Sequence, residues 1–183
     1  MRQYPNRNEM VKDLCKPGQI GAEIGVFEGG FSEVLLSTNP QRLYLIDWWR
    51  QQEGDYEADP TNLSVSDEMY LRVVAKFASN SAVVTLRLLS QEAAIHFPDK
   101  FFDWAYIDAD HTYKAAKNDL HLWCPKVKIG GLLMGHDYTT TSWIQVKQAV
   151  DEFLAGCELD YLSLEDWPSW GIIRKKKRYL IHL

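Results

Sequence analysis

Residues 20–32 read Ile20-Gly21-Ala22-Glu23-Ile24-Gly25-Val26-Phe27-Glu28-Gly29-Gly30-Phe31-Ser32. The segment predicts a short strand that ends at Glu23-Ile24, then a glycine turn, then a helix that starts near Gly30. Gly25 and the Gly29-Gly30 pair permit a positive φ and a close approach of a ligand to the backbone. The first turn of the helix offers N–H groups that have no partner within the helix. Such a loop is typical of the carboxyl end of the first strand in an open parallel sheet, where these folds bind ligands.

The spacing of the glycines distinguishes between classes of nucleotide-binding loop. A dinucleotide fingerprint requires G-x-G-x-x-G, whereas the register here is Glu23-x-Gly25-x-x-x-Gly29. This pattern resembles motif I of the S-adenosylmethionine-dependent methyltransferases with a Rossmann-like fold. Their cofactor carries a cationic sulfonium and a free α-ammonium but no pyrophosphate, so it benefits from a carboxylate that would repel a dinucleotide. A glycine turn that joins a strand to a helix without any ligand is the alternative.

The composition is that of one globular domain spanning residues 1–183. Hydrophobic residues make up 46% and aromatic residues 13% of the chain, which argues against disorder. The net charge of −5 does not favour nucleic acid or an anionic membrane as a partner, and no apolar run approaches the ~20 residues of a membrane span. The N-terminus lacks the apolar core of a signal peptide. Cys15, Cys124 and Cys157 are odd in number and lack C-x-x-C spacing, so we expect reduced thiols in a cytoplasmic protein.

Patterns of strand and helix type alternate at short intervals along the chain. We expect strands at 20–24, 43–47, 82–88, 101–107, 130–138, 159–164 and 171–174. We expect helices at 6–16, 30–37, 68–78, 91–96, 114–122 and 143–154. This alternation predicts an α/β fold with three layers. The polar stretch 50–67 is long for a loop inside a compact domain, and we expect it to form a lid over the site.

Asp47 closes the second expected strand, 24 residues after Glu23. A carboxylate there is placed to bind the two hydroxyls of a ribose, which NAD and S-adenosylmethionine share, or it is an ordinary turn residue. Of the tryptophans that follow, Trp48 is our candidate to stack on the adenine, with the core as the alternative for it and for Trp49. In the methyltransferases that the loop resembles, the segment after the third strand meets the adenine, which makes Ser90 and Gln91 candidates. Ser90 also suits the N-cap of the helix 91–96.

Polar side chains follow two further strands at the point where each strand ends. The fourth strand runs into Ile107-Asp108-Ala109-Asp110-His111, and the fifth runs into Gly135-His136-Asp137-Tyr138. Because the carboxyl ends of parallel strands meet at one edge of the sheet, these groups should gather on the edge that carries the glycine loop. Packing alone does not account for so many groups that can bind metals or transfer protons, namely Asp108, Asp110, His111, His136 and Asp137.

Taken together, these motifs resemble a class I S-adenosylmethionine-dependent methyltransferase. The closest group is the small bacterial enzymes similar to macrocin and related sugar or antibiotic O-methyltransferases, and the likeness runs from about residue 18 to 175. Ile107–Tyr113 is its most specific part. The resemblance implies a three-layer Rossmann-like fold with a seven-stranded, mostly parallel sheet that ends in an antiparallel hairpin, and S-adenosylmethionine as cofactor. It assigns cofactor binding to Glu23, Gly25, Val26, Phe27, Gly29, Gly30, Phe31, Ser32, Asp47, Trp48, Ser90, Gln91 and Asp108.

The resemblance also implies a metal and a base. In that family carboxylates at the fourth and fifth strand tips bind a divalent metal, and an aspartate two positions after the first ligand is the base. Carried over, Asp108 and Asp137 are ligands, His136 is a further candidate ligand, and Asp110 is the base. The family's metal-binding members often have two adjacent aspartates where this chain has His136-Asp137, and an imidazole suits magnesium less well than manganese. A metal-free enzyme would use His111 or His136 as its general base.

The function that these expectations describe is O-methylation of a small hydroxylated metabolite, a sugar or another natural product, with no nucleic acid or membrane partner. Trp143, Trp167 and Trp170 are expected to wall the acceptor pocket. An apolar tail at 179–183 favours a homodimer, and the basic run 174–178 is read as a solvated strand end.

Three other functions compete with this reading. A non-catalytic or regulatory cofactor-binding protein could keep the same fold. An NAD-dependent oxidoreductase would require the G-x-G-x-x-G loop that is missing here. A nucleic-acid methyltransferase would carry Asn/Asp-Pro-Pro-Tyr/Phe after the fourth strand, where this chain has Asp108-Ala109-Asp110-His111.

Overall fold

Eight strands form one sheet in the computed structural model, which describes residues 1–51, 65–141 and 144–175. The strands are β1 Arg2–Tyr4, β2 Ile20–Ile24, β3 Arg42–Asp47, β4 Val83–Arg87, β5 Phe102–Ile107, β6 Val127–Gly135, β7 Tyr161–Ser163 and β8 Trp170–Ile173. Their order across the sheet is β1-β7-β8-β6-β5-β2-β3-β4. β8 runs antiparallel to β6 and β7, and the other neighbouring pairs are parallel.

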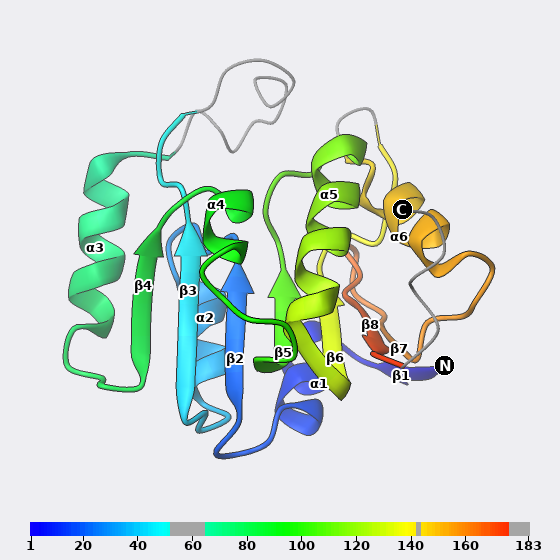
Figure 1. Cartoon of the computed structure of the whole chain (residues 1–183), viewed down its shortest axis with the longest axis horizontal. Helices are drawn as coiled ribbons and strands as arrows, with labels where there is room; N and C mark the ends of the chain where they lie inside the picture. Colours follow the sequence, from blue (N-terminus) through cyan, green and yellow to red (C-terminus); the bar gives the residue numbers. More distant parts are fainter. Residues whose placement is uncertain (52–64, 142–143, 176–183) are drawn as a thin grey trace.

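Helices connect the strands and cover both faces of the sheet (Figure 1). They are α1 Arg7–Leu14, α2 Gly30–Leu36, α3 Asp67–Phe77, α4 Ser90–Ala94, α5 Tyr113–Trp123 and α6 Val146–Leu154, with a short 3₁₀ helix at Cys124–Lys126. The expected α/β three-layer, Rossmann-like fold with antiparallel C-terminal strands is confirmed. The expected count of seven strands was one too low, because Arg2–Tyr4 adds an edge strand beside β7. Three residues are too few to show a period of two in the sequence.

Alternation along the strands divides the core into two halves. Leu43 and Leu45 of β3 pack with α1, α2 and α3 on one face, whereas Tyr44 and Ile46 pack with the buried side of α4, α5 and α6 on the other. This is the period of two that sends successive side chains to opposite faces of a sheet. The layers therefore follow directly from the apolar run that predicted the strand.

The parallel strands end at one edge, and their registers align the residues that follow them. Ile24 of β2 pairs with Ile107 of β5, and Ile107 pairs with Gly135 of β6. The next residues along these strands, Gly25, Asp108 and His136, therefore lie side by side. The chain passes from β2 to β3 on one side and reaches β5 on the other, which makes this edge the topological switch point of the sheet, where open α/β folds bind ligands.

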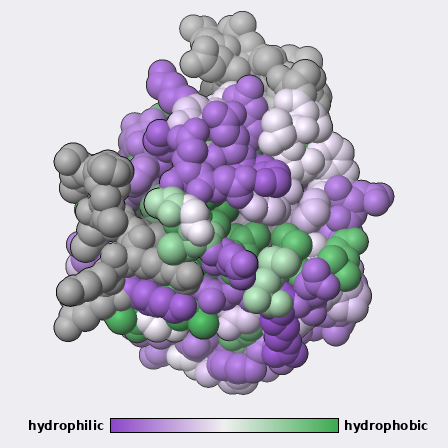
Figure 2. Space-filling model, turned by 90° about the vertical axis from the view of Figure 1, so that its right-hand side faces the viewer, coloured by the Kyte–Doolittle hydropathy of each residue, from purple (hydrophilic) through white to green (hydrophobic). Residues whose placement is uncertain are grey.

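Some expectations fall on residues that the structure does not describe. Most of the proposed lid at 50–67 does so, as do Trp143, the apolar tail and the end of the basic run. On the face at the β1 edge of the sheet, hydrophobic surface lies in small groups between hydrophilic side chains (Figure 2). The homodimer was predicted from the apolar tail, which lies outside the described residues, so it stays a prediction. Among the described helices, none has the length and apolar character needed to cross a membrane.

Two glycines in the sheet lie beneath tryptophan rings. Gly21 of β2 pairs with Trp104 of β5, and Gly135 of β6 pairs with Trp170 of β8. A Cβ on Gly21 would lie 2.1 Å from the Trp104 indole, which is fully buried. The absence of a side chain at these positions makes room for the large rings, which fill the space above each strand.

We expect Gly21→Ala to lower the free energy of unfolding by about 3 kcal/mol, because the added methyl group overpacks a core that has no space for it. Gly30→Ala is the matched control, since a Cβ there meets nothing within 4 Å. It should change stability by less than about 1 kcal/mol. Urea denaturation of the two variants beside the wild type measures the difference. Equal midpoints for the two variants would contradict the role of the Gly21–Trp104 pair.

Candidate functional site

A cavity of about 530 Å³ opens at the carboxyl edge of the sheet, with walls from the segments that follow β2 to β6. Most of the residues that the sequence assigned to cofactor binding line it: Glu23, Gly25, Val26, Phe27, Gly30, Phe31, Asp47, Trp48, Ser90, Gln91 and Asp108. So do the three catalytic candidates Asp110, His111 and His136, and the expected metal ligand Asp137. Gly29 and Ser32 are not part of its walls. The structure thus brings the two halves of the expected site into a single cavity.

The glycine loop fits against β5 with no space to spare. Gly25 has φ +87°, and a Cβ on it would lie 1.8 Å from the carbonyl oxygen of Asp108. Gly29 is the N-cap of α2 and has φ +72°. Its place in the motif follows from this turn, since a left-handed backbone favours glycine.

Asp47 holds the glycine loop in place. Its Oδ2 accepts hydrogen bonds from the N–H groups of Val26 at 2.8 Å and Phe27 at 2.9 Å, and its Oδ1 accepts from Trp49 N–H at 2.9 Å. Trp49 is fully buried and its indole donates to the Phe27 carbonyl, so it belongs to the core, whereas Trp48 lines the cavity. A ribose bound here would meet a carboxylate that is already oriented by backbone donors.

Glu23 is 1% exposed and accepts a hydrogen bond from the hydroxyl of Ser32. Burial raises the pKa of the Glu23 carboxyl well above its ordinary value, and the Ser32 hydrogen bond opposes that rise. Ser32 is itself fully buried and reaches the cavity only through Glu23. A cationic group in the cavity would favour the ionised form of this carboxyl.

Two carboxylates and two imidazoles form a cluster beyond the ends of β5 and β6. His111 Nε2 lies 2.9 Å from Asp137 Oδ2 and 3.8 Å from Asp108 Oδ1. His136 Nδ1 lies 3.3 Å from Asp137 Oδ1 and 3.7 Å from Asp108 Oδ1. Asp137 adopts a left-handed backbone with φ 54°, a conformation that is strained for a residue other than glycine and is often found at functional sites.

The imidazoles set the charge of this cluster. Burial acts to raise the pKa of Asp108 and of Asp137, but the hydrogen bonds from His111 and His136 outweigh it and hold both pKa values below the ordinary range. Burial acts to lower the pKa of His136, but the bonds to the two carboxylates raise it to about 9. At neutral pH the cluster therefore holds ionised carboxylates beside a protonated His136.

The cluster also has the composition of a metal site. Asp108, His111 and Asp137 each place one possible ligand atom within 4.8 Å of the others. The sequence had put His136 in this set, and the structure puts His111 there. Two carboxylates with one imidazole suit a first-row transition ion such as Mn²⁺ better than Mg²⁺, so the donor set fits a divalent ion.

Asp110, the expected base, stabilises the turn between β5 and α5. Its Oδ1 accepts a hydrogen bond from Thr112 N–H at 2.8 Å. Thr112 in turn caps α5 by accepting from Ala115 N–H. This pair forms the turn that leads from β5 into α5 and aims His111 at the cluster.

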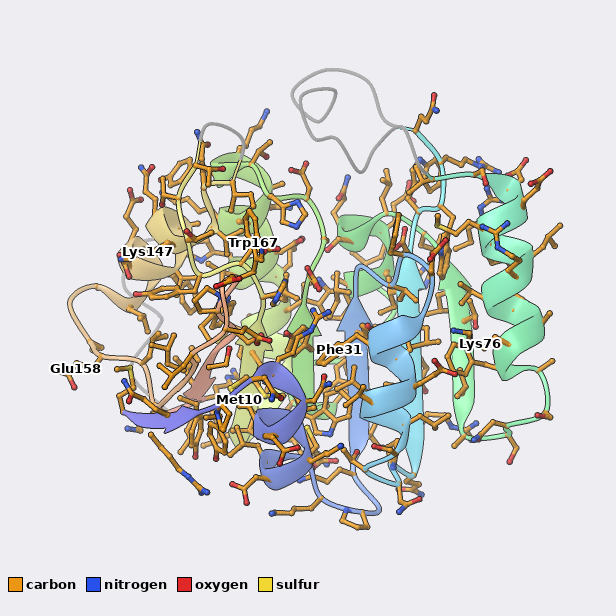
Figure 3. The ribbon with its side chains drawn as sticks, turned by 180° about the vertical axis from the view of Figure 1, so that it is seen from behind. Met10, Phe31, Lys76, Lys147, Glu158 and Trp167 are labelled. Atoms are coloured by element: carbon orange, nitrogen blue, oxygen red, sulfur yellow. The ribbon has the colours of Figure 1, made fainter. Side chains whose placement is uncertain are left out.

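Arg7 and Asp119 are cavity residues that the sequence did not predict. Arg7, in the first turn of α1, places Nη1 3.1 Å from Asp108 Oδ2 and stacks its guanidinium 4.4 Å above the Phe31 ring. Figure 3 shows Phe31 where α2 faces α1, and Trp167 near the carboxyl edge of the sheet. An arginine at the start of an amphipathic helix has the pattern of a solvated residue, so no local signal indicates its contact with a strand tip 101 residues away.

The three tryptophans that were expected to wall the acceptor pocket do not share one location. Trp167 lines the main cavity and is 41% exposed. Trp170 is buried over Gly135 and lines a smaller space behind the cluster. Trp143 lies outside the described residues.

Comparison with known proteins identifies relatives of this chain. A family model described as a methyltransferase domain matches residues 22–138. The uncharacterized protein R132 of Acanthamoeba polyphaga mimivirus is 31% identical over 140 residues, which are 73% of this chain and 58% of that protein. The chain thus spans a little more than half the length of this curated relative.

Solved structures share the fold at low sequence identity. SMU.1697c from Streptococcus mutans, in complex with SAH, has a TM-score of 0.64 at 12% identity and covers 93% of this chain and 97% of its own. The N-methyltransferase NodS from Bradyrhizobium japonicum has a TM-score of 0.63 at 16% identity, covering 93% and 95%. An rRNA methylase from Streptococcus thermophilus has a TM-score of 0.64 at 9% identity, covering 92% and 94%.

We expect Glu23→Gln to change how stability depends on pH. Because burial raises the pKa of the Glu23 carboxyl, ionising it costs free energy in the folded chain but not in the unfolded one. As the pH rises above the ordinary value of 4.5, the wild type should lose unfolding free energy relative to the variant. The difference should grow by up to about 1.4 kcal/mol per pH unit until the raised pKa is passed. Urea denaturation of both proteins over this range measures it, and parallel stability profiles would contradict the prediction.

Proposed function

The chain belongs to the methyltransferase-domain family, and from this membership we propose that it transfers a methyl group from S-adenosylmethionine to a hydroxyl group of a small molecule. One observation carries the proposal: a single cavity joins a glycine loop that has no room for a side chain to a cluster of carboxylates and imidazoles. The first would hold the cofactor, and the second would receive the acceptor. A sugar or a similar hydroxylated natural product is the proposed acceptor class, as in the macrocin-like O-methyltransferases that the sequence resembles.

The charge of the cavity supports a cationic cofactor. The acidic residues that line it are Glu23, Glu28, Asp47, Asp108, Asp110, Asp119 and Asp137. Among the described lining residues, Arg7 is the one arginine or lysine that faces them. Such walls would repel a pyrophosphate and attract the sulfonium and α-ammonium of S-adenosylmethionine. The same acidic walls disfavour a nucleic-acid acceptor, whose phosphates carry negative charge.

The reaction requires two things of the protein. The methyl group passes in line from sulfur to the acceptor oxygen, so the chain must hold the two at near-attack distance. The acceptor hydroxyl must also lose its proton, which we assign to an imidazole of the cluster. His111 is the first candidate, because Asp137 at 2.9 Å fixes its ring and stabilises the imidazolium that forms. His136 is the second candidate, but its two carboxylate neighbours raise its pKa to about 9, so it would act as a base only at alkaline pH.

A divalent ion would be held by Asp108, His111 and Asp137 in this proposal. When bound, it would supply Lewis-acid chemistry that lowers the pKa of the acceptor hydroxyl. His111 would then serve as a ligand. His136 could accept the proton only in its neutral form, which its raised pKa of about 9 confines to alkaline pH. Asp110 would orient the turn that carries His111 in either case.

We expect the wild type to bind S-adenosylhomocysteine and Gly25→Ala to bind it at least about 100-fold more weakly, because the added Cβ displaces the loop from the tip of β5. Isothermal titration calorimetry measures both affinities. Gly18→Ala is the matched control: Gly18 also has a positive φ, +79°, but a Cβ there meets nothing within 4 Å. It should lose some stability and keep its affinity within about threefold. Failure of the wild type to bind would overturn the cofactor assignment.

A crossed pair of variants separates the two ends of the cavity. Asp47→Asn should weaken S-adenosylhomocysteine at least about tenfold, because the amide cannot accept all the loop N–H groups, and should leave Mn²⁺ binding unchanged. Asp137→Asn should do the reverse, since it removes a charged ligand atom from the cluster. Titrations of Mn²⁺ and of S-adenosylhomocysteine into each variant give the four affinities. If Mn²⁺ does not bind the wild type, the ion is wrong while the cofactor assignment stands.

A further inference from the structure

The hydroxyl of Ser90, expected to meet the adenine, is already engaged. Ser90 Oγ donates its one proton to Asp119 Oδ1 at 2.5 Å and accepts a hydrogen bond from Trp123 Nε1 at 2.8 Å. Asp119 and Trp123 both lie on α5, and Ser90 begins α4, so this chain of bonds joins the two helices. Ser90 therefore has no proton left to give to a ring nitrogen of a base.

Asp119 is the polar group that this arrangement turns toward the cavity. It lines the cavity wall, yet the side chain is only 3% exposed. Within the described residues, the Asp119 carboxylate accepts its side-chain hydrogen bond through Oδ1, which leaves the acceptor capacity of Oδ2 for a ligand. A buried carboxyl with half of its acceptors unused is costly unless something else supplies the donors.

The surroundings of Asp119 suit a flat heterocycle. Leu88 and Leu89 directly before Ser90, Ala115 one turn before Asp119 on α5, and Ile144 just before α6 line the same cavity. Asp47, which is placed to meet a ribose, closes β3, and β3 pairs directly with the β4 strand that leads to Ser90. A nucleoside with its ribose at Asp47 would thus extend its base toward α4 and α5.

We infer that the Asp119 carboxylate, and not the Ser90 hydroxyl, recognises the exocyclic amino group of the adenine. Ser90 is a positioning residue: by donating to Oδ1 it turns Oδ2 toward the base. The inference rests on the proposed function, since it names the group that would read the base of S-adenosylmethionine. It makes the base end of the cavity specific for a 6-amino purine, because a 6-oxo purine would put an acceptor oxygen against the carboxylate.

The raised pKa of the Asp119 carboxyl is consistent with this role. Burial raises the pKa of Asp119 to about 7, and the hydrogen bond from Ser90 opposes the rise. An amino group that donates to Oδ2 would favour the ionised form and offset the cost of burying it. A test of base recognition therefore belongs at about pH 8.5, where the carboxylate is ionised before the ligand arrives.

The experiment compares S-adenosylhomocysteine with S-inosylhomocysteine, in which a 6-oxo group replaces the 6-amino group and N1 carries a proton. Calorimetric titrations at about pH 8.5 give both affinities for the wild type, Asp119→Asn and Ser90→Ala. We expect the wild type to prefer the adenosyl ligand by about tenfold or more. In Asp119→Asn the amide oxygen can still accept from Ser90, which turns the amide NH₂ toward the base. The variant should then bind the inosyl ligand at least as tightly as the adenosyl ligand, a reversal that a purely structural role would not produce.

Ser90→Ala is the matched control and should keep the wild-type preference within about threefold, even if both affinities fall. An unchanged preference in Asp119→Asn, or a lost preference in Ser90→Ala alone, would overturn the inference. Equal affinity of the wild type for both ligands would overturn it without any variant, which covers the case in which Asp119→Asn does not fold. Binding of neither ligand to the wild type would instead overturn the proposed function.

Discussion

The carbonyl oxygen of Asp108 occupies the space that a side chain on Gly25 would need, 1.8 Å from the position of its Cβ. Because glycine leaves this space free, the ends of β2 and β5 close against each other and the loop turns over the tip of β5. The side chain of Asp108 meanwhile faces His111, His136 and Arg7. One backbone contact therefore fixes the loop that would hold a cofactor relative to the cluster that would meet an acceptor. The proposed methyl transfer would depend on the distance between this loop and this cluster.

Asp108 is also the point where the N-terminal helix joins the site. The Arg7 guanidinium bonds to Asp108 Oδ2 and stacks on Phe31, and the Arg7 backbone N–H donates to Glu165 Oε1 in the loop between β7 and β8. The first helix thus links the tip of a central strand to a loop at the far edge of the sheet. Because Arg7 shares the partly buried Asp108 carboxylate with two imidazoles, the position of α1 and the charge at Asp108 are coupled.

Much of the fold was predictable because apolar runs that end in glycine or acidic residues mark strand ends, as at Ile24-Gly25, Asp47 and Asp108. The same signal predicted which polar groups would share one edge of the sheet. The edge strand Arg2–Tyr4 was not predictable, since its pairing with β7 is a tertiary contact without a local period. Arg7 and Asp119 were missed for a related reason. A polar residue on a helix has the pattern of a solvated face, and only the packing of α1 on α2 and of α5 on α4 turns these side chains inward.

The acidic walls of the cavity would repel one another if every carboxyl were ionised, and the structure divides four of these carboxyls into two kinds. Asp108 and Asp137 stay ionised beside imidazoles, whereas burial raises the pKa of Glu23 and of Asp119, to about 7 in the second case. Fixed negative charge thus lies at the proposed acceptor end, and carboxyls that can keep a proton lie at the proposed cofactor end. A ligand that brings a sulfonium, an ammonium and an amino group would favour the ionised form of these carboxyls. Glu23 and Asp119 would then ionise only when the ligand is bound. The empty cavity would avoid the free-energy cost of a buried, unpaired carboxylate.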